Sequence, residues 1–343
     1  MPDPQPPSAP SPLHARLAWA TSVTSRYGGP ASRSTGEPVL AQLDGLVEVL
    51  EQALREGSPA EIGQALHLAD VLGAAWERLG EHTTGRAGLD AALAAATRAG
   101  LHHELAVARV LRRRARLAMG ARLDAEADED LARAYAIAAA HDDEQLALSL
   151  LLDRADLAMH RGDWDQAVVV VPELLRRTEA TGDPLLQAMG LNRAGWSAFG
   201  LGEHVQARQR YERAKQLALL HEDPVVESRT ASGLGLLAML EGDHPAARAS
   251  WRRALELAEQ VHDRGFTLMC LDGVAALLAL EGRPGAARLA AAVTAVRVSV
   301  GRPREEGLRG LHELVLRQGE EPGEAWSYAE AVAFCRHAVA DPS

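Results

Sequence analysis

Lysine is almost missing from this sequence, because Lys215 is the only one among 36 lysine and arginine residues. Nucleotide-binding modules of the P-loop class need a glycine-rich loop and a lysine that reaches the phosphates. Lys215 instead lies in the helical segment Arg213-Ala214-Lys215-Gln216, which has no such loop. We therefore expect no ATPase domain in this chain and no nucleotide or other cofactor.

Cysteines and long apolar runs are also scarce. Cys270 and Cys335 are the only cysteines, and we expect both to be free thiols in a reducing compartment. No stretch of the sequence approaches the roughly 18 consecutive apolar residues of a membrane-spanning helix. Together these observations predict a cytoplasmic protein that does not bind membranes.

Aromatic residues make up only 4% of the chain, whereas hydrophobic residues make up 47%. The core is therefore built mainly from Ala, Leu and Val, which suits closely packed helices, and no alternation typical of strands stands out. Aspartate and glutamate number 47 against 36 lysine and arginine residues, which gives a net charge of −11. Such a charge disfavours general attraction to nucleic acid or anionic lipid, and we expect no direct nucleic-acid binding.

Catalytic motifs are not visible either. There is no serine on a glycine elbow and no Cys-His arrangement. The segment His102-His103-Glu104 comes nearest to a metal site, but neighbouring histidines on one helix point about 100° apart and no second ligand set follows. We expect this segment to form a turn between repeats, and we expect neither a metal site nor catalytic residues, so the protein is predicted not to be an enzyme.

The sequence does contain a short motif that is repeated every forty residues. Each copy has a glycine that can end one helix in a left-handed turn, and an alanine five positions later where a second helix must pack closely. The copies begin at Gly162, Gly202, Gly242 and Gly282, and they end at Ala167, Ala207, Ala247 and Ala287. Such a period indicates stacked copies of one helical hairpin.

A second marker runs between the hairpins with the same period. It consists of Asp142-Asp143, Asp183-Pro184, Asp223-Pro224 and His262-Asp263. An aspartate before a proline is typical of a helix N-cap followed by a first-turn proline. Each repeat therefore holds two helices of roughly sixteen residues, within the usual range for globular proteins. Earlier copies are less regular, since Arg122 takes the place of the turn glycine while Ala127 keeps the small position.

These markers divide the chain into three parts. Residues 1–38 are rich in proline and serine and are expected to be disordered, with a possible short helix. Residues 39–301 are expected to form the repeat array, with an extra helix over 39–56 before five or six hairpins. Residues 302–343 break the period, and helices over 304–318 and 323–340 are expected to cap the last apolar face.

The small residues within the repeats resemble those of the tetratricopeptide repeat. In two copies they are Gly195, Ala207, Ala214 and Gly235, Ala247, Ala254. The copy at 162 departs from the pattern with Leu174, and the copy at 282 with Thr294. The resemblance implies an all-α, right-handed superhelical solenoid of antiparallel helix hairpins with a concave groove. The period of forty exceeds the usual 34 or so, which implies helices longer by about a turn.

A narrower resemblance rests on the two ends of the array. The segments 43–57, 65–69 and 76–82 are similar to the start of the sensor region in MalT-like, LuxR-type ATPase transcription regulators of the STAND class. The stretches 288–292, 325–326 and 330–333 are similar to its end. In that family the repeats receive a ligand or protein signal, so the resemblance implies an interaction module, either free-standing or a fragment, without the ATPase and DNA-binding domains.

An arginine stripe is the most chemically suggestive cluster. Arg109, Arg112 and Arg116 are three and four residues apart, so they share one helix face, at positions that line the groove in tetratricopeptide proteins. Such a stripe could hold a carboxylate or phosphate through forked hydrogen bonds. The alternative is a solvated helix face paired with Asp128, Glu129 and Asp130 of the next helix.

Further groove positions supply different chemistry. Asp156 and Arg229 are expected on the inner face, together with the amide of Asn192 and the rings of Trp196 and Phe199. An exposed tryptophan beside an amide suits a peptide, because the ring buries apolar side chains while the amide pairs with peptide backbone. Trp196 could equally fill the core between repeats.

The sequence thus predicts a scaffold or sensor module without enzymatic activity. We expect it to bind a protein or peptide segment, possibly an acidic one, in signalling or transcription regulation. A small-molecule effector bound in the same groove is the alternative. A long open channel would favour the peptide, and an enclosed polar pocket would favour the small molecule.

Overall fold

The computed structural model describes residues 12–25, 37–301, 309–317 and 326–340, and every regular element among them is an α-helix. The helices form a right-handed solenoid of antiparallel hairpins, as the repeat pattern predicts. No helix in these described ranges is both long and apolar enough to cross a lipid bilayer.

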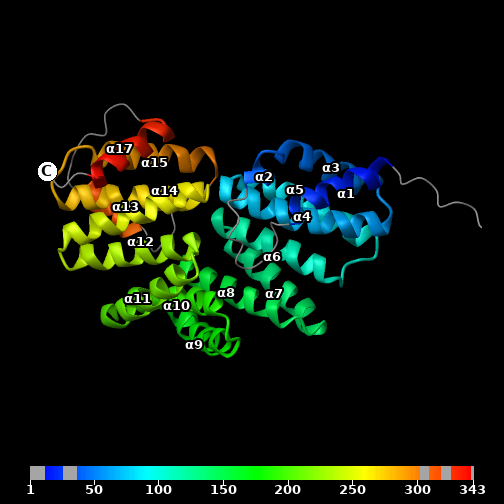
Figure 1. The fold of residues 1–343 in the computed structure, drawn as a ribbon, viewed down its shortest axis with the longest axis horizontal. Helices are drawn as coiled ribbons and strands as arrows, with labels where there is room; N and C mark the ends of the chain where they lie inside the picture. Colours follow the sequence, from blue (N-terminus) through cyan, green and yellow to red (C-terminus); the bar gives the residue numbers. More distant parts are fainter. Residues whose placement is uncertain (1–11, 26–36, 302–308, 318–325, 341–343) are drawn as a thin grey trace, which may run out of the picture.

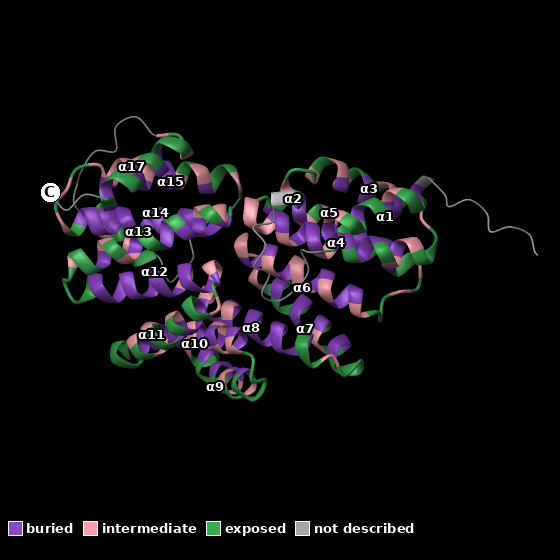
Figure 2. Ribbon diagram, in the orientation of Figure 1, coloured by how far each residue is buried: buried purple, intermediate pink, exposed green. Residues whose placement is uncertain are grey.

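Six consecutive hairpins make up the array (Figure 1). The first helices of the hairpins are α4 (Pro59–Leu79), α6 (Leu105–Gly120), α8 (Glu144–Arg161), α10 (Pro184–Gly200), α12 (Pro224–Leu240) and α14 (Arg264–Leu280). Their partners are α5 (His82–Arg98), α7 (Asp124–Ala140), α9 (Trp164–Ala180), α11 (His204–Leu220), α13 (His244–Gln260) and α15 (Ala286–Ser299). In Figure 2 the first helices α12 and α14 are buried along most of their length, whereas α11 and α13 carry exposed faces.

The turns and caps follow the sequence markers. Gly162, Gly202, Gly242 and Gly282 have φ values of 69°, 77°, 75° and 65°, the left-handed conformation that ends the first helix of a hairpin. Arg122 takes this conformation with φ 62° where the glycine is replaced. The side chains of Asp143, Asp183, Asp223 and Asp263 accept N-cap hydrogen bonds. His102 and His103 lie in the turn between α5 and α6.

The small positions lie where helices touch. Ala127, Ala167, Ala207 and Ala247 have no exposed surface. The last copy differs, because α15 begins at Ala286 after Gly285, which has φ 94°, and Ala287 is only half-buried.

Ion pairs repeat with the array as well, since Arg208 pairs with Glu241 and Arg248 with Glu281, 33 residues apart in both cases.

Shorter helices flank the array. α1 (Pro12–Thr24), α2 (Glu37–Leu40) and α3 (Leu43–Glu56) precede it, and α1 packs on α3 and α4 through the buried Leu17 and Ala20. α1 lies in the region expected to be disordered apart from a possible short helix. α16 (Arg309–Leu316) and α17 (Tyr328–Ala340) pack against α14, and α17 also contacts α13 and α15. The rest of the predicted capping helices, residues 304–308, 318 and 323–325, lies outside the described residues.

The superhelix brings its two ends together. α14 contacts α4, ten helices earlier in the chain. In Figure 1 the yellow and orange helices of the last repeats lie beside the blue and cyan helices of the first, with α8 to α11 below them. The first helices of the hairpins therefore lie on the inner side of the superhelix.

Candidate ligand-binding groove

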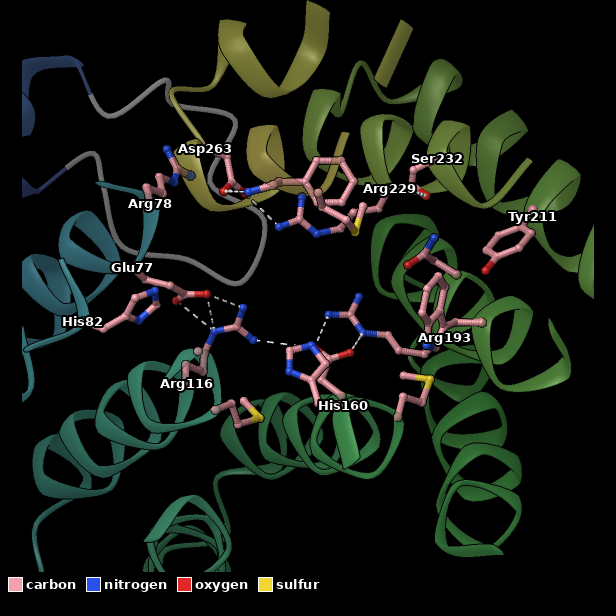
Figure 3. Close-up of a pocket in the computed structure, with 18 residues that line it drawn as sticks. Glu77, Arg78, His82, Arg116, His160, Arg193, Tyr211, Arg229, Ser232 and Asp263 are labelled. Carbon is pink, nitrogen blue, oxygen red and sulfur yellow. Dashed lines mark hydrogen bonds and ion pairs between the residues drawn. The ribbon is translucent and has the colours of Figure 1, made fainter. Parts of the chain in front are cut away.

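Three cavities lie along the inner faces of the first helices. The central cavity has a volume of about 170 Å³, and α4, α6, α8, α10, α12 and α14 all contribute to its walls (Figure 3). The charged cavity, about 150 Å³, shares Glu77, Arg116, Arg193 and Arg229 with it. The end cavity, about 370 Å³, extends from Arg112, shared with the charged cavity, to α1. Neighbouring cavities share lining residues, so the three lie in succession along the inner face, and we refer to them together as the groove.

The predicted arginine stripe lies in this groove, but its charges are paired. Arg112 hydrogen-bonds to Asp153 of α8, and Arg116 lies 2.5 Å from Asp153 and 2.5 Å from Glu77 of α4. Arg109 lies at 3.5 Å from Asp143. The stripe does not pair with Asp128, Glu129 or Asp130 of α7, because its partners are Glu77 of α4, Asp153 of α8 and the α8 N-cap Asp143. The alternative pairing is formed instead by the neighbouring Arg114, which binds Asp130 at 2.6 Å.

Asp156 and Arg193 continue this network from α8 to α10. Arg193 donates to both oxygens of Asp156 at 3.0 and 2.9 Å, and Arg116 lies 3.7 Å from Asp156. Together the three cavities are lined by equal numbers of arginine and carboxylate side chains. The groove is therefore electrically balanced in a protein that carries a charge of −11.

The buried carboxylates and arginines of this network keep each other charged and in place. Burial by itself would raise the pKa of Asp153, but the guanidinium groups of Arg112 and Arg116 hold it below its usual value. Burial would likewise raise the pKa of Glu77, but Arg116, together with Arg113 and Arg229, lowers it below its usual value. These carboxylates are therefore ionised at neutral pH and fix the arginine side chains in place.

The central cavity is more apolar than the rest of the groove. Met119, Met159, Met269, Trp196 and Phe266 contribute to its walls. Trp196 is half-buried, packs against three core clusters and lines the cavity, so it occupies both of the positions considered for it.

Of the predicted groove residues Asn192 and Phe199, one lines the cavities and the other does not. Asn192 lines both the central and the charged cavity. Phe199 stacks on Trp196 with ring centroids 5.8 Å apart but lines none of the three cavities.

Arg229 projects into the central cavity from α12. One guanidinium nitrogen donates to Asp263 at 2.9 Å, and the group lies 4.5 Å above the ring centroid of Phe266. Its Nη1 atom is buried and has no hydrogen-bond partner among the described residues. Arg229 therefore lies where the ion pairs meet the apolar wall (Figure 3).

Tyr211 is a cavity residue that the sequence patterns do not single out. It belongs to α11, a second helix, yet it lines the central cavity between α10 and α12. Figure 3 shows its hydroxyl directed towards the cavity. The signal in the sequence that could have identified Tyr211 is the pair of glycines Gly195 and Gly233 in the two inner helices, because they leave room for its ring.

Comparison with known structures places this geometry among helical repeat proteins. No protein-family model matches the sequence, and no curated protein is significantly similar to it. NprR in complex with its cognate peptide NprX is 14% identical with a TM-score of 0.63, over 92% of this chain and 90% of NprR. A Rap protein complexed with competence and sporulation factor is 11% identical with a TM-score of 0.61, over 98% of this chain and 90% of Rap.

A third similar structure is a STAND protein with a tetratricopeptide repeat sensor from Pyrococcus horikoshii. It is 12% identical with a TM-score of 0.46, over 96% of this chain and 53% of that protein. This likeness is too weak to carry an argument. The fold is that of tetratricopeptide-like helical repeat proteins.

Proposed function

We propose that this protein binds a peptide segment along its inner groove and acts as a sensor in signalling or transcription regulation, without enzymatic activity. The observation that carries the proposal is the succession of three adjoining cavities along the inner face from α1 to α14. A groove of this kind suits an extended chain, since successive side chains can occupy successive cavities. The NprR structure holds a cognate peptide and the Rap structure holds competence and sporulation factor, which supports a peptide ligand here.

The charge pattern narrows the kind of peptide. Because the arginines of the groove are matched by carboxylates, an acidic segment must either bind at the remaining donor of Arg229 or displace a carboxylate from its arginine. An acidic group near the central cavity and apolar residues beside it fit this arrangement. A MalT-like or LuxR-type setting, in which an ATPase and a DNA-binding domain respond to the bound ligand, is the regulatory context we propose.

The test is a selection from a display library of random dodecapeptides on the immobilised full chain. We expect enriched peptides to bind with micromolar or tighter Kd by calorimetry. Asn192→Ala and Trp196→Ala should weaken that binding tenfold or more, because both line the central cavity. Arg252→Glu, on the exposed face of α13, is the matched control and should leave the Kd unchanged.

Two outcomes would count against the proposal. If no peptide is enriched above an empty support, the groove does not serve as a peptide site. If Arg252→Glu abolishes binding and the groove variants retain it, the peptide binds the outer surface instead.

A further inference from the structure

Tyr211 reaches the central cavity through a gap between two inner helices. A Cβ atom on Gly195 of α10 would lie 2.7 Å from its ring, and a Cβ on Gly233 of α12 would clash with its Cζ atom. Both glycines are therefore required for the ring to pass from α11 to the groove side. The ring is held by rigid backbone on both faces, so its hydroxyl has a fixed position.

The hydroxyl of Tyr211 has no hydrogen-bond partner among the described residues, although only 1% of the residue is exposed. Burial raises the pKa of this hydroxyl well above its usual value, so the group keeps its proton and can donate. An unpaired buried donor costs free energy, and most buried polar groups in proteins do have a partner. Nothing in the packing of the repeats requires a hydroxyl here, because a phenylalanine would fill the same gap.

The next repeat shows how the same construction looks when the polar atom is satisfied. Trp251 occupies the position forty residues after Tyr211. Its ring passes between Gly235 of α12 and Gly273 of α14. Its ring N–H donates to the sulfur of Met239 at 3.2 Å. Tyr211 is thus the one member of this pair whose polar atom lies at a cavity and remains unpaired.

The size and walls of the central cavity indicate what kind of group could bind beside the Tyr211 hydroxyl. Its volume of about 170 Å³ is close to the roughly 150 Å³ of an engineered apolar cavity that binds benzene, so it holds about one large side chain. Three of its wall residues are methionines, whose unbranched side chains can repack around an entering group and give it access to the hydroxyl.

We infer that the central cavity is the anchor subsite of the groove: it takes one large apolar side chain of the bound peptide, and Tyr211 donates a hydrogen bond to an acceptor oxygen of that peptide. This inference rests on the proposed peptide-binding function. A ligand without the acceptor leaves the hydroxyl unpaired, so Tyr211 is a specificity-determining residue.

The test uses peptides enriched from the random dodecapeptide library on the full chain. We expect one apolar position to dominate among them, and its replacement by alanine to weaken binding at least tenfold. Tyr211→Phe keeps the ring, so it should leave the melting temperature unchanged or raised while weakening these peptides at least fivefold. Tyr135→Phe, on α7 outside the three cavities, is the matched control and should change the Kd less than twofold.

A second variant tests the cavity itself. Met159→Ala enlarges it, so a repeated selection should favour a larger side chain at the anchor position. If peptides bind but Tyr211→Phe binds them as wild type does, or if the anchor preference stays the same in Met159→Ala, the inference is wrong while the proposed function stands. If no peptide binds the wild-type chain, both are wrong.

Discussion

The two halves of the groove are held together by different means. From α4 to α10, successive inner helices are joined by buried ion pairs, with Asp153 at the centre of the network. From α10 to α14, they approach each other mainly through glycines, and aromatic rings from the second helices fill the gaps, while the pair between Arg229 and Asp263 adds one ion pair between α12 and the N-cap of α14. Ion pairs need both partners to hold their geometry, whereas a glycine gap needs only the absence of a side chain. The first half thus depends more on charge, and the second more on shape.

The largest effect should come from breaking the network at its centre. Asp153→Asn leaves Arg112 and Arg116 without their shared carboxylate, although Arg116 keeps Glu77. We expect the free energy of unfolding to fall by about 3 kcal/mol in urea denaturation. The control is Glu173→Gln, which removes an exposed pair with Arg176 and should lower the free energy of unfolding far less, because water and salt screen exposed charges. Equal losses in the two variants would show that the buried network does not stabilise the first half.

The second half should instead be sensitive to added volume. Gly233→Ala places a methyl group against the Tyr211 ring, which cannot move away because Gly195 packs on it. We expect a loss of about 2 kcal/mol. The matched control is Gly63→Ala in α4, where no atom lies within 4 Å of the added Cβ; it should gain about 0.5–1 kcal/mol, because alanine favours the helix. A gain in both variants would contradict the tight gap at Gly233.

Acid should destabilise the first half of the groove more than the second. The pKa values of Asp70, Glu77 and Asp153 are lower in the folded protein than their usual values. Such groups stabilise the fold above the unfolded-state pKa, near 4, and this stabilisation is lost as the pH falls further. We therefore expect Asp153 to contribute less to the free energy of unfolding at pH 3 than at pH 7.

The measurement for this prediction is amide hydrogen exchange at pH 7 and pH 3, corrected for intrinsic exchange rates. Protection should fall in α4 to α8 before it falls in α12 and α14. A uniform loss along the array would mean that the ion pairs of the first half do not decide its stability in acid.

The smallest effect concerns the turns, where we expect the halves to behave alike. Glu222, in the turn before α12, has φ 52°, a conformation that costs a residue with a side chain but not glycine. Glu222→Gly should therefore raise the free energy of unfolding by about 0.5 kcal/mol, measured by thermal denaturation. Asp142→Gly, at the equivalent turn of the first half with φ 52°, should have an effect of similar sign and size. Opposite signs would show that the halves differ in their turns as well.

The sequence predicted the turns and caps because their chemistry is local. A left-handed turn at Gly162 and an N-cap at Asp223 each depend on residues within a few positions. The partners of Arg116 were not predictable in this way, since Glu77 and Asp153 lie 39 and 37 residues away and meet it only through the superhelical twist. Tyr211 was missed for the same reason: its place at the groove depends on glycines of two other helices.

The contact between α14 and α4 has a consequence for how a partner can load. Because the last repeat touches the first, the groove is closed along its side and open at its two ends. A flexible chain with a free terminus can thread such a passage, whereas a loop whose two ends are anchored in a folded domain can enter only if the contact separates. For the proposed peptide site we therefore expect a preference for partners with a free terminus over anchored loops, whatever their side chains.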